Sequence, residues 1–237
     1  KDLKVELAYK LEKDSENVEK IVKVTPKESK LVVYFPTEKE THLKFIIQGP
    51  YKTTPNRENI PLDDKQNQKI IEETAQLVAD SLPRIKKLGY LNVGFLELLP
   101  FDEELCEEEI YSAIYEKVKS MLLSDEKLLP TKHGGYSHPT DSILARGKEL
   151  TNLLNQSDIQ LLFDRSHWLS TDITYDRTQA LRDYIINELD VDEITFEDFA
   201  NEITEEFIKG KTDAWIIGFY KKLRYQTALF RGKDRFN

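Results

Sequence analysis

The chain has 237 residues, of which 39% are hydrophobic and 32% are charged, a balance typical of a folded protein and not of a disordered one. Its single cysteine excludes an internal disulfide and favours a reducing compartment, so we expect a cytoplasmic protein. No apolar run approaches the roughly 18 residues that a membrane-spanning helix needs, so we expect no membrane segment.

The net charge of −9 is unevenly distributed along the chain. Residues 1–62 contain 12 Lys and Arg against 10 Asp and Glu, whereas the remaining 175 residues contain 22 against 33. Binding to a nucleic-acid backbone needs clustered Lys and Arg, so we expect no nucleic-acid surface in this acidic remainder. The chain begins with Lys1 in place of Met and enters a strand pattern at once, from which we expect a piece of a longer protein.

The first 48 residues predict four strands. Residues 3–11 alternate between hydrophobic and polar side chains, which is the pattern of a half-buried strand. Residues 21–24 and 31–35 are short β-branched and aromatic runs, and residues 42–48 form a fourth, more apolar strand. The short polar connections favour antiparallel neighbours.

Residues 63–88 predict one long amphipathic helix. Asp63 and Gln66 form a candidate capping box at its start, Pro83 is expected to kink or break it, and Gly89 is expected to end it. Its apolar stripe contains Ile70, Ile71, Thr74, Leu77, Val78, Leu82 and Ile85. We expect this stripe to cover the four-stranded sheet.

From residue 91 onward the pattern predicts an almost wholly helical domain. The expected helices are 91–99, 102–123, 143–154, 159–163, 178–189, one capped by Thr195 that bears Phe199, Ile203 and Phe207, and a last one capped by Thr212. The Pro- and Gly-containing segment 129–140 predicts a linker or sub-boundary. The sequence therefore predicts an α+β fold: a sheet-plus-helix domain at 1–90, whose mostly antiparallel sheet of about four strands is covered by the long helix, and an all-α domain at 91–237.

The loop after the fourth strand is the strongest candidate for a functional segment. It starts at Gly49-Pro50 and ends at Pro61, and its three prolines restrict its backbone. Rigidly held cations in such a loop suit an anionic target, although a connection with merely solvated charges fits the composition equally well. Its candidate side chains are Lys52, Thr53, Thr54 and Arg57.

Other candidate chemistry is weaker. His133 and His138 are too few for a metal site of normal coordination, so we expect no metal. Cys106 lies among acidic residues, which oppose a reactive thiolate. We find no nucleophile-base set, and therefore no complete catalytic site. Three arginines are candidates for salt bridges between helices or for exposed positions: Arg146, Arg177 and Arg182.

Two segments together resemble one protein family. The first is Leu31-Val32-Val33-Tyr34-Phe35-Pro36-Thr37-Glu38-Lys39-Glu40-Thr41, and the second is residues 45–61, with Gly49-Pro50-Tyr51-Lys52-Thr53-Thr54-Pro55-Asn56-Arg57. Supporting similarity lies at 128–131, 144–147, 168–170 and 173–178. The segments resemble large proteins, described as chaperone-like or sacsin-like, that carry an ATP-binding module of the GHKL superfamily, which includes the ninety-kilodalton heat-shock chaperones and the histidine kinases.

This resemblance covers most of the chain and places it after the nucleotide-binding module, as the middle or transducer segment. The chain lacks the Asp-x-Gly-x-Gly motif and the glycine-rich lid of that module. ATP and Mg²⁺ are therefore expected in the preceding module. The resemblance implies that this segment alone is inactive and that the whole protein is an ATPase. The implied partners are the ATP-binding module of the same chain and an unidentified protein client.

In this superfamily the segment after the ATP-binding module provides a basic residue that senses the γ-phosphate. The resemblance implies Lys52 or Arg57 for this role, with Thr53 and Thr54 beside them. The segment would then couple the nucleotide state to the conformation of the protein.

An alternative hypothesis is a helical interaction scaffold with no nucleotide role. The last helix carries an aromatic stripe that includes Trp215, Phe219 and Tyr220 and continues to Phe230. These side chains are expected either to form core or to face a partner. Burial of these aromatic residues would count against the scaffold, whereas an exposed patch of several hundred Å² would support it.

Overall fold

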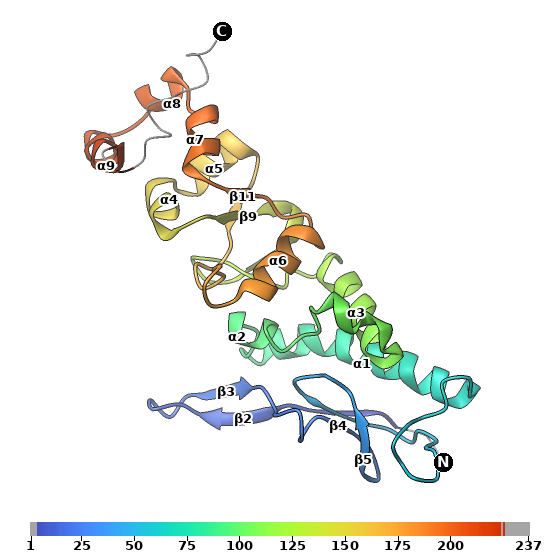
Figure 1. The fold of residues 1–237 in the computed structure, drawn as a ribbon. Helices are drawn as coiled ribbons and strands as arrows, with labels where there is room; N and C mark the ends of the chain where they lie inside the picture. Colours follow the sequence, from blue (N-terminus) through green and yellow to red (C-terminus); the bar gives the residue numbers. More distant parts are fainter. Residues whose placement is uncertain (1–3, 224, 226–237) are drawn as a thin grey trace. The chain divides into compact units, whose positions relative to one another are not determined.

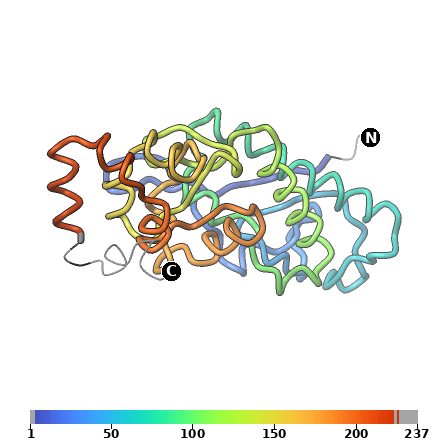
Figure 2. Tube along the Cα trace, turned by 90° about the horizontal axis from the view of Figure 1, so that it is seen from above, coloured from blue at the N-terminus to red at the C-terminus, as the bar shows by residue number. Residues whose placement is uncertain are grey.

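The computed structural model describes residues 4–223 and 225, and it has the expected α+β character, with 43% helix and 16% strand. The chain divides into two compact units, Lys1–Leu128 and Leu129–Asn237, which we call the N-terminal and the C-terminal unit. Figures 1 and 2 trace their elements in two views. None of the helices in the described ranges combines the length and the apolarity that a bilayer crossing needs.

The N-terminal unit contains a four-stranded sheet and a separate hairpin. The sheet comprises β1 (Glu6–Ala8), β4 (Lys30–Val33), β5 (Phe35–Glu40) and β6 (Ile46–Gln48) in the order β1-β6-β4-β5. Its pairs are antiparallel except for the parallel pair of β4 and β6. The hairpin pairs β2 (Lys10–Lys13) with β3 (Glu19–Val22).

The expected first strand is divided at Tyr9 into β1 and β2. The ring of Tyr9 packs against Phe45 and Phe95, with ring centroids 5.3 and 5.4 Å apart, and its hydroxyl lies 3.0 Å from Ser81 Oγ. Chain segments on either side of this anchored residue pair with different neighbours. Leu3, the first residue of the expected strand, lies outside the described residues.

The long helix α1 (Lys65–Lys87) forms as expected, with its N-cap one residue later than predicted. The cap is Asp64 and not Asp63, because the Asp64 side chain accepts the backbone N–H groups of Gln66 and Asn67. The helix continues through Pro83. It ends at Lys87, and Gly89, the residue after the Leu88 cap, has a φ of +80° that permits two closing hydrogen bonds, Gly89 N to Lys86 O and Tyr90 N to Ile85 O.

Two expected helices are shorter than predicted. The helix expected at 91–99 is reduced to α2 (Val93–Leu96), which Asn92 caps. The helix expected at 102–123 is divided into the 3₁₀ helix η1 (Glu103–Glu107) and α3 (Glu109–Leu122), because Glu108 adopts an extended backbone.

The unit boundary lies between Leu128 and Leu129 and not near residue 90, because α3 packs along α1 (Figure 1). Both helices bury their apolar faces: Leu82 of α1 and Ile114 of α3 are fully buried. The observed boundary falls at the start of the segment 129–140.

The C-terminal unit contains strands, so the expected all-α module is a wrong prediction. A hairpin pairs β7 (Leu129–Pro130) with β8 (Tyr136–Ser137), within the segment expected to be a linker. A three-stranded parallel sheet has the order β10-β9-β11, formed by β9 (Ser142–Ala145), β10 (His167–Trp168) and β11 (Glu193–Ile194). Strands of two to four residues are too short to show the period-2 pattern on which the prediction depends.

The helices of this unit follow the strands closely. They are η2 (Pro139–Asp141), α4 (Lys148–Leu153), α5 (Gln156–Phe163), α6 (Gln179–Asn187), α7 (Phe196–Glu202), α8 (Glu205–Lys209) and α9 (Asp213–Leu223). Thr195 caps α7 in a capping box with Asp198, as expected, but the chain turns after Ile203, so Phe207 lies on α8. A core of side chains such as Ile143, Trp168 and Phe199 joins the sheet to the helices.

Truncation of Leu122 tests the assignment of α3 to the N-terminal core. Leu122 is 1% exposed and its neighbour Leu123 is 43% exposed. We expect Leu122→Ala to lower the free energy of unfolding by about 2–5 kcal/mol because it leaves a cavity. The matched control Leu123→Ala should cost less than about 1 kcal/mol. Urea denaturation followed by circular dichroism measures both, and equal effects would contradict this packing.

Candidate functional site

The start of the 50–61 loop is pinned to α1 by Tyr51. The Tyr51 ring is 3% exposed, its hydroxyl lies 2.7 Å from Thr74 Oγ1, and burial raises its pKa to about 12. A side chain at Gly49 would collide with this ring, since a Cβ there would lie 2.8 Å from Tyr51 Cε2. The Gly49-Pro50 turn therefore serves the close approach of the loop to α1.

Lys52 is held by two residues of the α1 N-terminus. Its Nζ lies 2.6 Å from Asp64 Oδ2, and its backbone N–H donates to Asn67 Oδ1 at 2.8 Å. Asn67 is fully buried and its Nδ2 donates to the carbonyls of Lys52 and Pro61, at 3.0 and 2.9 Å. Asn67 thus ties both ends of the loop to the helix, a role that sequence reasoning missed.

Arg57 connects the loop to the sheet. Its Nη2 donates to the carbonyls of Val33 and Phe35, at 3.0 and 2.9 Å, and its own carbonyl accepts the N–H of Glu38. The guanidinium makes no other contact of this kind with the residues that the structure describes. Arg57 is half-buried and has a φ of +59°, a left-handed conformation that is uncommon for a residue other than glycine.

The two threonines have different surroundings. Thr54 closes the loop internally: its N–H donates to Asn59 O at 2.9 Å, and its carbonyl accepts the N–H of Arg57 at 2.9 Å. Thr53 is half-buried. The four candidate residues therefore lie on one ordered loop, where both cations already have partners within the chain.

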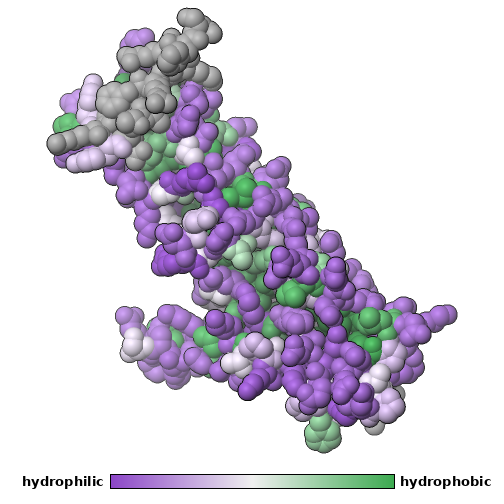
Figure 3. Space-filling model, viewed as in Figure 1, coloured by the Kyte–Doolittle hydropathy of each residue, from purple (hydrophilic) through white to green (hydrophobic). Residues whose placement is uncertain are grey.

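The sheet residues that Arg57 contacts lie beside two exposed aromatic side chains. Tyr34 and Phe35, at the turn between β4 and β5, are 78% and 73% exposed, and Tyr34 has a φ of +58°. The face of the molecule shown in Figure 3 is largely hydrophilic, with hydrophobic side chains in separate areas.

The aromatic residues of α9 divide between core and surface. Trp215 and Phe219 stack with ring centroids 5.1 Å apart and pack against the buried core, and Trp215 Nε1 donates to Leu153 O at 2.7 Å. Tyr220 is 66% exposed. Phe230 lies outside the described residues. Two of the three aromatic residues of the scaffold hypothesis are therefore partly buried against the core, and the third is exposed.

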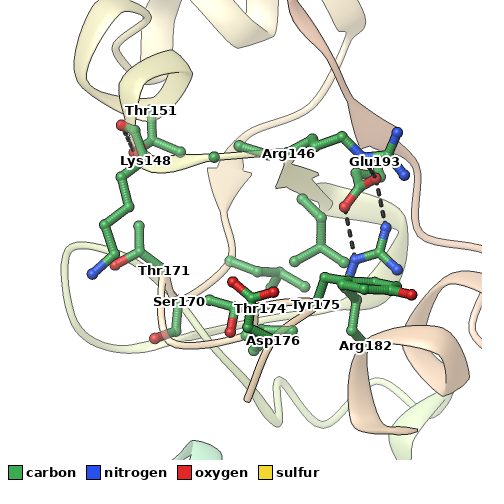
Figure 4. A pocket seen from close by; sticks show the side chains of 15 residues that line it. Arg146, Lys148, Thr151, Ser170, Thr171, Thr174, Tyr175, Asp176, Arg182 and Glu193 are labelled. Carbon is green, nitrogen blue, oxygen red and sulfur yellow. Dashed lines mark hydrogen bonds and ion pairs between the residues drawn. The ribbon is translucent and has the colours of Figure 1, made fainter. Parts of the chain in front are cut away.

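A cavity of about 290 Å³ lies within the C-terminal unit, at the carboxyl ends of the parallel strands β9 and β10 (Figure 4). Its walls come from the end of β9 and the start of α4, from residues 169–176 after β10, from α6 and from β11. Carboxyl ends of parallel strands are where ligands bind in open α/β sheets. The sequence prediction missed this cavity because it did not predict the strands.

One wall of the cavity is an ion-pair cluster around Glu193. Arg182, which is 8% exposed, places Nε 2.8 Å from Glu193 Oε1 and Nη2 2.6 Å from Oε2. Arg146 Nε lies 3.1 Å from the same Oε2. Arg177 pairs with Asp172 at 3.6 Å. The three arginines considered as salt-bridge candidates therefore all form ion pairs.

The other candidate chemistry shows no assembled site. His138 caps η2, His167 Nδ1 lies 3.5 Å from Gln156 Nε2, and Cys106 is partly buried in η1. Over the residues described, no group of three or more His, Cys, Asp or Glu side chains could hold a metal ion.

Comparison of the chain with protein-family models, with curated proteins and with solved structures found no match. The similarity to chaperone-like GHKL ATPases therefore depends on the residues of this sequence alone, and its functional content stays a prediction.

The Asp64 carboxylate makes the loop anchor sensitive to pH. Its hydrogen bond with Lys52, followed by those from the Asn67 and Gln66 N–H groups, holds the pKa of Asp64 below its usual range. Asp64 therefore stabilises the fold above its unfolded-state pKa, and this contribution is lost as pH falls through the lower folded-state pKa.

Asp64→Asn should remove this pH-dependent contribution while keeping a helix cap, because asparagine also caps helices. We expect the variant to be less stable than the native chain at neutral pH, and the difference to shrink on acidification. Urea midpoints measured across that range test this. Asp63→Asn is the control and should follow the native curve; a constant difference for Asp64→Asn would contradict the assignment.

Proposed function

We propose that this chain is the middle or transducer segment of a chaperone-like GHKL ATPase, which couples the nucleotide state of a preceding ATP-binding module to the conformation of the protein. The observation that carries this proposal is the left-handed backbone conformation of Arg57 together with the hydrogen bonds of its guanidinium to the sheet. Its support from sequence is the resemblance of residues 31–41 and 45–61 to that family.

Arg57 is held at a cost in backbone energy. A residue other than glycine in the left-handed region costs on the order of 1–3 kcal/mol, and such strain persists only where surrounding contacts impose it. Here the contacts are the two carbonyls that Arg57 Nη2 binds and the N–H of Glu38 that its carbonyl accepts. Strained residues of this kind concentrate at ligand clamps and switches.

Arg57 fits the sensing role better than Lys52 does. Its two carbonyl bonds use one guanidinium nitrogen, Nη2, which leaves the N–H groups of Nε and Nη1 to donate to an oxyanion. Lys52 would first have to leave Asp64, with which it forms a 2.6 Å ion pair. A cation placed on a transferring phosphoryl group stabilises the charge that develops there.

The contacts of Arg57 also suggest how sensing is transmitted. Because Nη2 binds the carbonyls of Val33 and Phe35, a displacement of Arg57 acts directly on the turn between β4 and β5. Phosphate binding would thus compete with, or reorient, bonds that fix this turn. In this mechanism the segment contributes no nucleophile or base of its own.

The test is ATP turnover by the full-length protein that contains this segment. We expect Arg57→Ala to lower kcat by at least about tenfold, since arginines in this role contribute about 10³–10⁵ to the rate. Lys52→Ala should have a smaller effect. Lys30→Ala is the matched control, because it removes a cation that pairs with Glu38 on the same sheet.

Unfolding of each variant must be measured alongside its turnover, because Arg57 also stabilises the loop. A loss of turnover with an unchanged Tm and intact ATP binding supports sensing. Native turnover in folded Arg57→Ala protein would overturn the proposal.

A further inference from the structure

Five charged side chains line the cavity of the C-terminal unit, and three of them, Arg146, Arg182 and Glu193, form the Glu193 cluster. The second carboxylate that balances the two arginines is that of Asp183, outside the lining, whose Oδ1 lies 2.8 Å from Arg182 Nη1. Arg182 binds both carboxylate oxygens of Glu193, and Arg146 Nε contacts one of them. This cluster forms one wall (Figure 4). The remaining charges are Lys148, at the start of α4, and Asp176, in the segment after β10.

Lys148 and Asp176 are not paired with each other. Within residues 4–223 and 225, neither the Lys148 ammonium nor the Asp176 carboxylate makes a hydrogen bond or ion pair, and both residues are exposed. They come from different elements that the fold holds on different sides of the cavity (Figure 4). The cavity therefore presents one uncompensated positive charge and one uncompensated negative charge to whatever enters it.

Two hydroxyl groups add hydrogen-bond donors. Ser170 Oγ accepts the N–H of Asp172, and Thr174 Oγ1 accepts the N–H of Arg177, each at 3.3 Å. With an acceptor site already used, each hydroxyl keeps its proton for donation. Both residues line the cavity, where a carboxylate could accept these protons.

The cavity also has an aliphatic part. Leu144, Leu169 and Ile173 line it and are 3%, 2% and 5% exposed. A ligand with an apolar side chain would bury hydrocarbon against these residues, which stabilises binding in proportion to the area covered.

We propose that this cavity binds a small zwitterion with an aliphatic side chain, that is, a free α-amino acid of the leucine type. The carboxylate lies toward Lys148 and the hydroxyls, the ammonium lies toward Asp176, and the side chain covers Leu144 and its neighbours. A volume of about 290 Å³ is at the lower end of the range for small-molecule sites and suits a ligand of this size. The inference does not depend on the proposed transducer function.

Three probes with the same aliphatic group distinguish the contribution of the ligand's carboxylate from that of its ammonium. L-leucine carries both, isocaproate lacks the ammonium, and isoamylamine lacks the carboxylate. Isothermal titration calorimetry of the 237-residue chain should rank L-leucine first by about tenfold over either analogue, because each analogue lacks one charge-assisted contact and a tenfold change corresponds to about 1.4 kcal/mol. Amide NMR shifts should change at residues 144–148 and 169–176.

Two substitutions assign the contacts. Lys148→Ala should weaken L-leucine binding about tenfold and reduce the preference for L-leucine over isoamylamine. Asp176→Asn should make L-leucine and isocaproate equivalent. Lys209→Ala and Asp213→Asn change exposed charges away from the cavity and should leave binding unaltered.

Three outcomes would overturn the proposal. The first is no binding of L-leucine at millimolar concentration by folded protein. The second is equal binding of L-leucine and isocaproate by the native chain, which would indicate a simple anion site. The third is an unchanged preference for L-leucine in both Lys148→Ala and Asp176→Asn.

Discussion

A single buried amide, that of Asn67, holds the 50–61 loop in its position. Asn67 lies in the first turn of α1, is fully buried, and bonds the N–H and carbonyl of Lys52 and the carbonyl of Pro61. Every one of these backbone groups would lose a partner if the side chain were apolar, and the loop would lose its hydrogen bonds to α1 at both ends. The prolines stiffen the loop, but the amide decides where it lies.

With its ends fixed by Asn67, the loop can hold Arg57 against the sheet. The far end of the loop turns through Thr54 and Arg57, and the guanidinium reaches the carbonyls that flank Tyr34. Tyr34 is itself left-handed, so the β4–β5 turn and the loop stabilise each other's uncommon backbone conformations. Local strain and long-range hydrogen bonds are thus combined in one small region, which is what a switch requires and what a simple connection does not.

The sequence was informative where a pattern is long enough to repeat. The stripe from Ile70 to Ile85 predicts α1 because it covers four helical turns. The prediction is confirmed, and the observed helix starts two residues after the expected start. Asp63 and Asp64 could not be separated as caps, since both are good N-cap residues and only the side-chain geometry chooses. Strands as short as His167–Trp168 give no periodic signal, so the parallel sheet and its cavity could not be predicted from the sequence.

The candidate loop could be found from sequence, but its internal bonds could not. Asn67 is a polar residue at a helical spacing that puts it on the apolar face of α1, and this mismatch is the one signal that pointed to a buried partner. Likewise, nothing in the spacing of Arg146, Arg182 and Glu193 indicates that they meet. Parallel pairing of β9 with β11 brings Arg146 close to Glu193, and Arg182 reaches Glu193 from α6.

The two regions differ in what a ligand must displace. At the loop, Arg57 and Lys52 are engaged with carbonyls and with Asp64, so an incoming anion gains only the difference between new and existing contacts. At the cavity, Lys148 and Asp176 have no such contacts to give up among the described residues, so a ligand of matching charge has to displace only water from them. Cations that must exchange one partner for another suit a site where ligand binding changes the conformation. Unpaired charges beside an aliphatic wall suit a site that binds a ligand without such a change. This difference is consistent with the proposed switch role of the loop and with the proposed ligand site in the cavity.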